Sequence, residues 1–131
     1  MIAVCSIAGL AGAAASAPSA ATQASCVKVF ERQRACSDLF IPALVDLRVS
    51  LDKPAGIAAA VKKDGRQAMI STALEEWQSD SADAAIAKTC ASMPGTSQLA
   101  SSVTSMEKCL GAATCQAFSE CVIPLMRATI H

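Results

Sequence analysis

The amino-acid sequence predicts an all-α fold: an irregular bundle of five to six helices, stapled by disulfides and preceded by an N-terminal signal segment. Three observations support this prediction. The hydrophobic fraction is 53 %, with only three Phe, one Trp and no Tyr. Much of it is alanine, the best helix former, while the residues that favour strands are scarce. Apolar positions recur at threes and fours, and six cysteines follow the first 25 residues.

The N-terminal segment resembles a leader for export. Its first 25 residues carry no charge and are rich in Ala, Gly and Ser. The run 2–15 suits the apolar region of a secretory signal peptide, and small-residue cleavage sites end at Ala17 and Ala21. The second site is preferred because the first would leave a proline at the new terminus. We therefore expect residues 1–21 to be a cleaved signal peptide and residues 22–131 to form a single domain.

Other interpretations of this leader stay open. No Lys or Arg precedes the apolar run, so either the true start lies upstream or the basic region is lost. A membrane anchor is one alternative, although the stretch is short and alanine-rich for a span. A lipoprotein is another: Cys26 lacks the aliphatic residue expected three positions before it, and Cys5 has one but lies near the start. We expect a periplasmic or extracellular protein with no stable membrane span after cleavage.

Six cysteines remain after the leader, and they are the candidate disulfide residues: Cys26, Cys36, Cys90, Cys109, Cys115 and Cys121. An even number in a short exported chain predicts a disulfide framework. Each bridge would add about 2–4 kcal/mol, which compensates for an alanine-rich core that buries little area. We expect at least one bridge from Cys26 or Cys36 to the 109–121 cluster, in which a hairpin brings Cys109 near Cys115.

Metal binding is the alternative use of these cysteines. Zinc sites favour cysteines about two to four residues apart, whereas nine, 53, 18, five and five residues separate these, and the one histidine is His131. Cu(I) accepts Cys and Met, but the methionines are spread out as core residues would be: Met69, Met93, Met106 and Met126. The Cys26–Cys36 spacing resembles one half of the twin CX9C helical hairpins, which the last three cysteines do not repeat. No metal or cofactor is predicted.

The first amphipathic segment predicts a helix that begins near Thr22–Ser25 and runs toward Leu51. Its apolar side holds two cysteines: the residues are Cys26, Val27, Phe30, Cys36, Phe40, Ile41, Leu44, Leu47 and Leu51. Pro42 removes a backbone donor, so we expect a kink there or two helices in line. Asp52 is then expected to cap a short helix with Pro54 in its first turn.

The turn at Asp64-Gly65 predicts the start of a third amphipathic helix. Its inward face repeats at threes and fours: Met69, Ile70, Ala73, Leu74 and Trp77. Ser79 or Asp80 is expected to cap the following helix, which buries Ile86, Cys90 and Met93 and stops at Pro94-Gly95.

Two further helices complete the prediction. Thr96 or Ser97 opens the first, which faces inward with Leu99, Val103, Met106 and Leu110. Gly111 suits a left-handed stop after it. Thr114 is expected to cap the last helix, and Pro124 to bend it. Its inward residues are Cys115, Phe118, Val122, Leu125 and Met126.

No constellation typical of catalysis appears, and we predict that the protein is not an enzyme. Nucleophilic triads need a histidine base, and His131 is the terminal residue. Glu75 and Glu76 are adjacent on a helix, so their carboxylates diverge. Asp80 and Asp83 fall where a helix is expected to start, and negative charge is favourable there without any function.

The charge and aromatic content of the sequence limit the classes of partner that we expect. Eleven positive and eleven negative charges cancel, so no nucleic-acid partner is predicted. Trp77 is expected in the core, and Lys62, Lys63 and Arg66 as a solvated basic spot. Three functions remain: a non-catalytic interaction protein with an unknown protein partner, a carrier of a small, lipid-like apolar ligand in an alanine-lined cavity, and a thiol-based Cu(I)-binding or redox protein.

Overall fold

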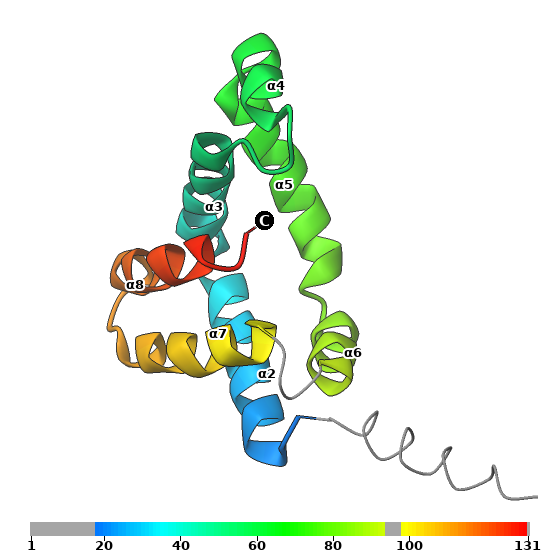
Figure 1. The fold of residues 1–131 in the computed structure, drawn as a ribbon, viewed down its shortest axis with the longest axis vertical. Coiled ribbons are helices and arrows are strands. Elements are labelled where there is room, and N and C mark those ends of the chain that lie inside the picture. The colour runs from blue at the N-terminus through cyan, green and yellow to red at the C-terminus, as the bar shows by residue number, and fades with distance from the viewer. Residues whose placement is uncertain (1–17, 94–97, 131) are drawn as a thin grey trace, which may run out of the picture.

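The computed structural model describes residues 18–93 and 98–130. Within these residues the chain forms helices and no strand, which confirms the predicted all-α class. The elements are α2 (Ala20–Ala35), α3 (Ser37–Leu51), α4 (Ile57–Asp64), α5 (Arg66–Asp80), α6 (Asp83–Ser92), α7 (Gln98–Glu107), the 3-10 helix η1 (Lys108–Gly111) and α8 (Cys115–Arg127). Figure 1 shows α2 and α3 in succession along the long axis, with α7 and α8 lying across it.

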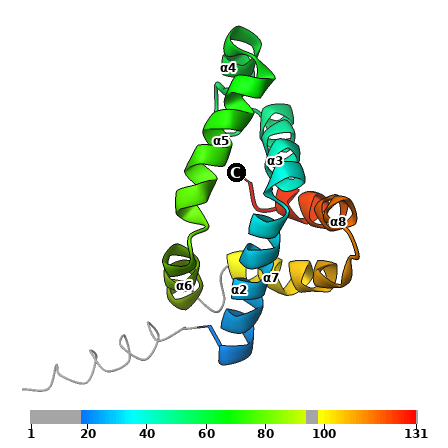
Figure 2. The same cartoon turned by 180° about the vertical axis from the view of Figure 1, so that it is seen from behind.

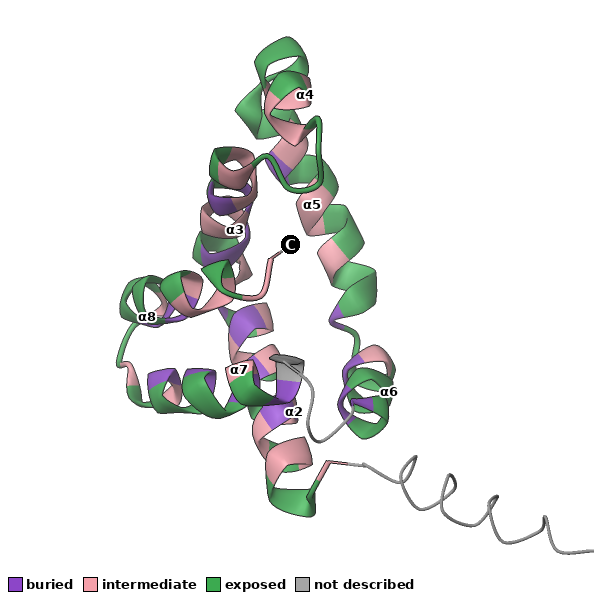
Figure 3. Cartoon of the chain, in the orientation of Figure 1, coloured by how far each residue is buried: buried purple, intermediate pink, exposed green. Residues whose placement is uncertain are grey.

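The helices form a packed body with an arm beside it. α2 packs against α6 and α7, and α3 packs against α8 and α5. The arm is α4 and α5, which Figure 2 shows running beside the α2–α3 axis. Most buried side chains belong to the body; α5 contributes only Ile70, and α4 contributes none. Figure 3 shows the same contrast, with α4 exposed or intermediate along its length.

The first long segment is interrupted at Cys36, whereas the sequence predicted the interruption at Pro42. Pro42 lies inside α3, and the two helices follow one another as predicted. The hydroxyl of Ser37 donates to the carbonyl of Arg34 at 2.6 Å. Such side-chain bonds compete with the backbone ladder and bend helices. The tertiary bridge of Cys36 also fixes the chain at this point.

Asp52 caps α4 from a distance. Its backbone is left-handed, with φ of 47°, and its carboxylate accepts from the amides of Gly56 and Ala58 at 3.1 Å each. The pKa of Asp52 is therefore lowered, first by the bond from Ala58 and then by that from Gly56. The prediction is confirmed only in part: Asp52 accepts from amides at the start of α4, but Gly56 is the N-cap and Pro54 precedes the helix, which begins at Ile57.

The junction of α5 and α6 differs from the prediction. Ser79 and Asp80 belong to α5, and Ala82 is the N-cap of α6. The reason is tertiary: the guanidinium of Arg34 donates to the carbonyl of Ser81 at 2.7 Å and to the carboxylate of Asp83 at 2.6 Å. These bonds hold the turn at Ser81–Asp83, which lies after Ser79 and Asp80, the residues that local sequence favoured as the N-cap.

The C-terminal hairpin closes without a left-handed glycine. Gly111 ends η1, and the amide of Ala112 donates to the carbonyl of Cys109 at 3.0 Å. A 3-10 turn satisfies the last carbonyls, so no positive φ is needed there. Thr114 caps α8 as predicted, accepting from the amide of Ala117 at 3.1 Å.

Arg32 holds the connection between η1 and α8 against α2. Its guanidinium donates to the carbonyl of Ala112 at 3.0 Å and lies 5.5 Å from the ring centroid of Phe118. Both contacts are structural, since they satisfy a loop carbonyl and cover a buried ring.

Several expectations fall outside the described residues. They concern the apolar run 2–15, the stop at Pro94-Gly95, the cap at Thr96 or Ser97, the inward side chain of Leu99, and His131.

Candidate ligand-binding pocket

Three disulfides hold the body of the molecule. They join Cys26 to Cys90, Cys36 to Cys115 and Cys109 to Cys121, with Cα–Cα distances of 5.7, 5.2 and 5.7 Å. The second bridge confirms the expected link from the first long segment to the C-terminal cluster. Cys109 bonds to Cys121, and Cys115 bonds back to the start of α3. All six predicted cysteines are thus paired, and three disulfides fit an oxidising compartment.

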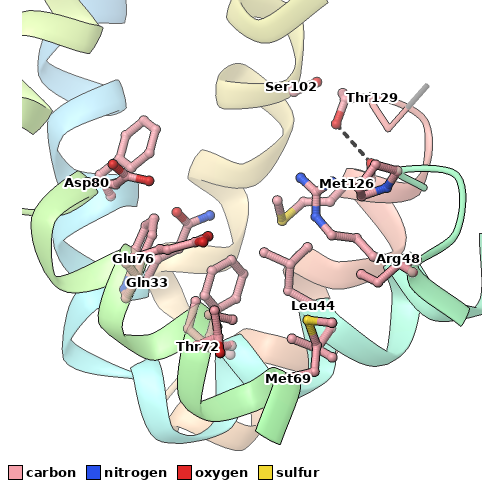
Figure 4. A pocket seen from close by; sticks show the side chains of 18 of the residues that line it. Gln33, Leu44, Arg48, Met69, Thr72, Glu76, Asp80, Ser102, Met126 and Thr129 are labelled. Atoms are coloured by element: carbon pink, nitrogen blue, oxygen red, sulfur yellow. Dashed lines mark hydrogen bonds between the residues drawn. The ribbon is translucent and has the colours of Figure 1, made fainter. Parts of the chain in front are cut away.

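A pocket of about 730 Å³ lies between the body and the arm. Its volume falls within the roughly 300–1,000 Å³ of small-molecule sites. Side chains of α2, α3, α4, α5, α7 and α8 line it, and most of them are apolar. Figure 4 shows these side chains converging from the helices on either side.

Two helical stripes form the main walls. On α3 the stripe consists of Phe40, Ile41, Leu44, Val45 and Arg48. On α5 it consists of Met69, Thr72, Ala73, Glu76, Trp77 and Asp80. Residues three and four apart share one face of a helix, so each helix presents one continuous stripe. Ala73 lies in the middle of the α5 stripe, and its short side chain leaves room between the walls.

Trp77 lines the pocket and ties α5 to the body. Its ring lies 6.3 Å from that of Phe30 and 5.9 Å from that of Phe40, centroid to centroid. Its indole Nε1 donates to the hydroxyl of Ser37 at 3.0 Å. Trp77 thus packs on the edge of the core as predicted, and it also lines the pocket.

The polar lining divides between two ends. Figure 4 shows Glu76 and Asp80 on one side of the pocket, and Arg48 on the opposite side with Met126 and Thr129. The two carboxylate residues are exposed, whereas Arg48 is partly buried. Gln33 is 4 % exposed, and its side-chain amide donates to the sulfur of Met106 at 3.9 Å.

The acidic residues singled out in the sequence do not form one centre. Glu76 and Asp80 line the pocket, Glu75 is exposed outside its lining, and Asp83 pairs with Arg34 at 2.6 Å. Among residues 18–93 and 98–130, no group of His, Cys, Asp and Glu is arranged to hold a metal ion.

The three residues of the expected basic spot, Lys62, Lys63 and Arg66, differ in their surroundings. Lys62 and Lys63 are exposed on α4. Arg66 forms a two-pronged pair with Asp46, at 2.8 and 2.9 Å, and this hydrogen bond lowers the pKa of Asp46. In the described part of the chain, no helix has the length and apolarity needed to cross a membrane.

Arg48 is the charged lining residue that the sequence did not lead us to expect in a pocket. It lies four residues after Leu44 and eight after Phe40, so it continues the apolar stripe of α3. A cation in line with apolar positions was the signal that could have identified it.

Comparisons of the chain with protein-family models, with curated proteins and with solved structures found no match. The function is therefore inferred from the pocket itself.

Proposed function

We propose that the protein is an exported, non-catalytic binding protein that carries a small apolar ligand in the pocket between α3 and α5. The observation that carries the proposal is a pocket of about 730 Å³ between α3 and α5 in which most of the lining residues are apolar. Apolar ligands bind in concave sites of this kind, where burial removes their surface from water.

The distribution of the disulfides supports a carrier. Every bridge joins elements of the body, and none of the three reaches α4 or α5. One wall of the pocket is therefore covalently braced. The other wall is held without a bridge, by Trp77 and Ile70, by the exposed Arg66–Asp46 pair and by the α4 connection. In a carrier, displacement of α5 would admit the ligand and the braced wall would keep its shape.

The expected export is consistent with this role. An uncharged, small-residue leader precedes Cys26, and disulfide-rich small domains are typical of the periplasm and the cell exterior. The Cu(I)-binding alternative requires reduced cysteines, whereas all six cysteines beyond the expected leader are bonded. An unknown protein partner stays a prediction.

Blocking the pocket tests the proposal. Trp77 is the one tryptophan of the chain and lines the pocket, so its emission reports an apolar ligand directly. Titration of the oxidised protein with hexadecan-1-ol should change this emission in a saturable manner. Ala73→Phe fills the middle of the pocket and should weaken binding by about tenfold or more, the cost of about 1.4 kcal/mol of lost burial.

Ala68→Phe is the matched control. Ala68 is exposed on the same helix and outside the pocket lining, so it carries the same change in helix propensity without blocking the site. It should bind like the unaltered protein. The carrier function is wrong if the unaltered protein binds no apolar or amphipathic ligand, or if both variants bind as tightly as it does.

A further inference from the structure

We propose that the carried ligand is a single-chain amphiphile with an anionic head, and that Arg48 binds this head while the chain extends toward Trp77. This inference rests on the proposed carrier function and specifies its ligand class. The Arg48 guanidinium lies among the apolar side chains of the α3 wall. Core packing does not explain a cation at this position.

Arg48 is the one lysine or arginine in the pocket lining. Other arginines are engaged within the protein: Arg32 with the Ala112 carbonyl, Arg34 with Asp83, and Arg66 with Asp46. The Arg48 guanidinium, by contrast, makes no hydrogen bond or ion pair with any described residue. Its donors are available to a ligand.

The position of Arg48 in α3 has a partial structural explanation. Arg48 lies in the last turn of the helix, where a cation is favoured by the helix dipole. An exposed side of the same turn would serve that purpose equally well. The dipole therefore accounts for the cation but not for its place in the pocket.

The chemistry of the guanidinium selects the head group. Arginine presents a planar fork of donors that matches a carboxylate with two parallel hydrogen bonds. Partial burial beside apolar side chains strengthens such a pair relative to one in water. The apolar side chains that line the rest of the pocket accept an alkyl chain. A ligand that combines this chain with an anionic head is a fatty acid or a similar amphiphile.

The charges at the other end fix the direction of binding. Glu76 and Asp80 line the pocket on the side opposite to Arg48. Both are exposed, so solvent screens their repulsion, but an anionic head is still favoured at the Arg48 end. The chain then lies past Leu44 toward Trp77, where it changes the indole environment.

Two probes of equal chain length isolate the head group. We would titrate the oxidised protein with hexadecanoic acid and with hexadecan-1-ol, following Trp77 emission at neutral pH. The acid should bind at least about tenfold more tightly, the effect of one charge-assisted contact. Arg48→Gln should remove this preference, so that the acid and the alcohol bind this variant with equal affinity, and Arg48→Lys should retain part of it.

Lys88→Gln is the matched control, because it removes one positive charge from an exposed position on α6 outside the pocket. It should keep the full preference for the acid. A second measurement uses the unaltered protein only: hexadecanoic acid, and not the alcohol, should protect Arg48 from phenylglyoxal, as detected by mass spectrometry. This measurement keeps the test valid if Arg48→Gln fails to fold.

The outcomes separate the two proposals. Equal binding of acid and alcohol by the unaltered protein, or an equal loss in Lys88→Gln, overturns the role of Arg48 and leaves the carrier function standing. The same holds if Arg48 is modified at the same rate with and without the acid. Binding of neither probe overturns the carrier function itself.

Discussion

At the scale of single residues, Trp77 joins the arm to the body by one hydrogen bond and two ring contacts. Its Nε1 donates to the Ser37 hydroxyl at 3.0 Å, and that hydroxyl in turn donates to the Arg34 carbonyl at 2.6 Å. The pair thus stabilises two features at once, the bend between α2 and α3 and the attachment of α5. The attachment of α5 could not be predicted from local sequence, because 40 residues separate Trp77 from Ser37.

Trp77→Phe should test this link. The variant keeps an apolar ring but loses the donor, so urea unfolding followed by circular dichroism should show a loss of about 1–2 kcal/mol. Ser37→Ala removes the acceptor, and the double variant should be less destabilised than the sum, with a coupling of about 0.5–1.5 kcal/mol. Strict additivity of the two single changes would contradict a direct interaction between the two side chains.

At the scale of elements, the sequence predicted which segments are helical better than where they end. The amphipathic stripe of α5 and the Thr114 cap follow from local pattern, and both are confirmed. The boundary at Cys36 coincides with the Cys36–Cys115 bridge, and the start of α6 coincides with the bonds from Arg34 to Ser81 and Asp83. All of these are tertiary contacts. The bridge partners and the pocket share this origin, because both arise from helices that meet only in the folded chain.

The arm offers a pH-dependent test of one boundary. The amides of Ala58 and Gly56 donate to Asp52 and lower its pKa. Because the folded pKa lies below the unfolded value, this stabilisation is present above the unfolded pKa and is lost as the pH falls through the folded one. NMR titration from about pH 6 to about pH 2 should show the Gly56 and Ala58 amides shifting with one midpoint, below the ordinary aspartate value.

The control for this titration is Asp52→Ala, in which the low-pH shift of both amides should disappear while α5 amides remain unchanged. Asp46 provides an internal comparison, since its pKa is lowered by Arg66 and not by backbone amides. A midpoint for the Gly56 and Ala58 shifts at or above the ordinary value would show that Asp52 does not cap α4 in solution.

At the scale of the whole molecule, the three bridges differ in the exposure of their cysteines and in the length of chain that each bridge spans. Cys26 and Cys90 are each 0 % exposed, and their bridge spans 64 residues. The Cys109–Cys121 bridge spans 12 residues, and Cys121 is exposed. Thiol–disulfide exchange requires access to a sulfur atom, so the bridges should open in a defined order even though they form one framework.

Limited reduction with dithiothreitol, followed by alkylation and peptide mass spectrometry, should label Cys109 and Cys121 first, and Cys26 and Cys90 last.

Chain-entropy arguments assign about 4 kcal/mol to each long-range bridge and about 3 kcal/mol to the short one. Loss of the two long-range bridges would therefore remove a large share of a stability of about 5–15 kcal/mol. We expect full reduction to abolish cooperative thermal unfolding, because the alanine-rich helices bury too little area to hold the body alone. A fully reduced, metal-free sample with an unchanged Tm would contradict this account, whereas selective opening of Cys109–Cys121 should leave the pocket and its Trp77 response intact.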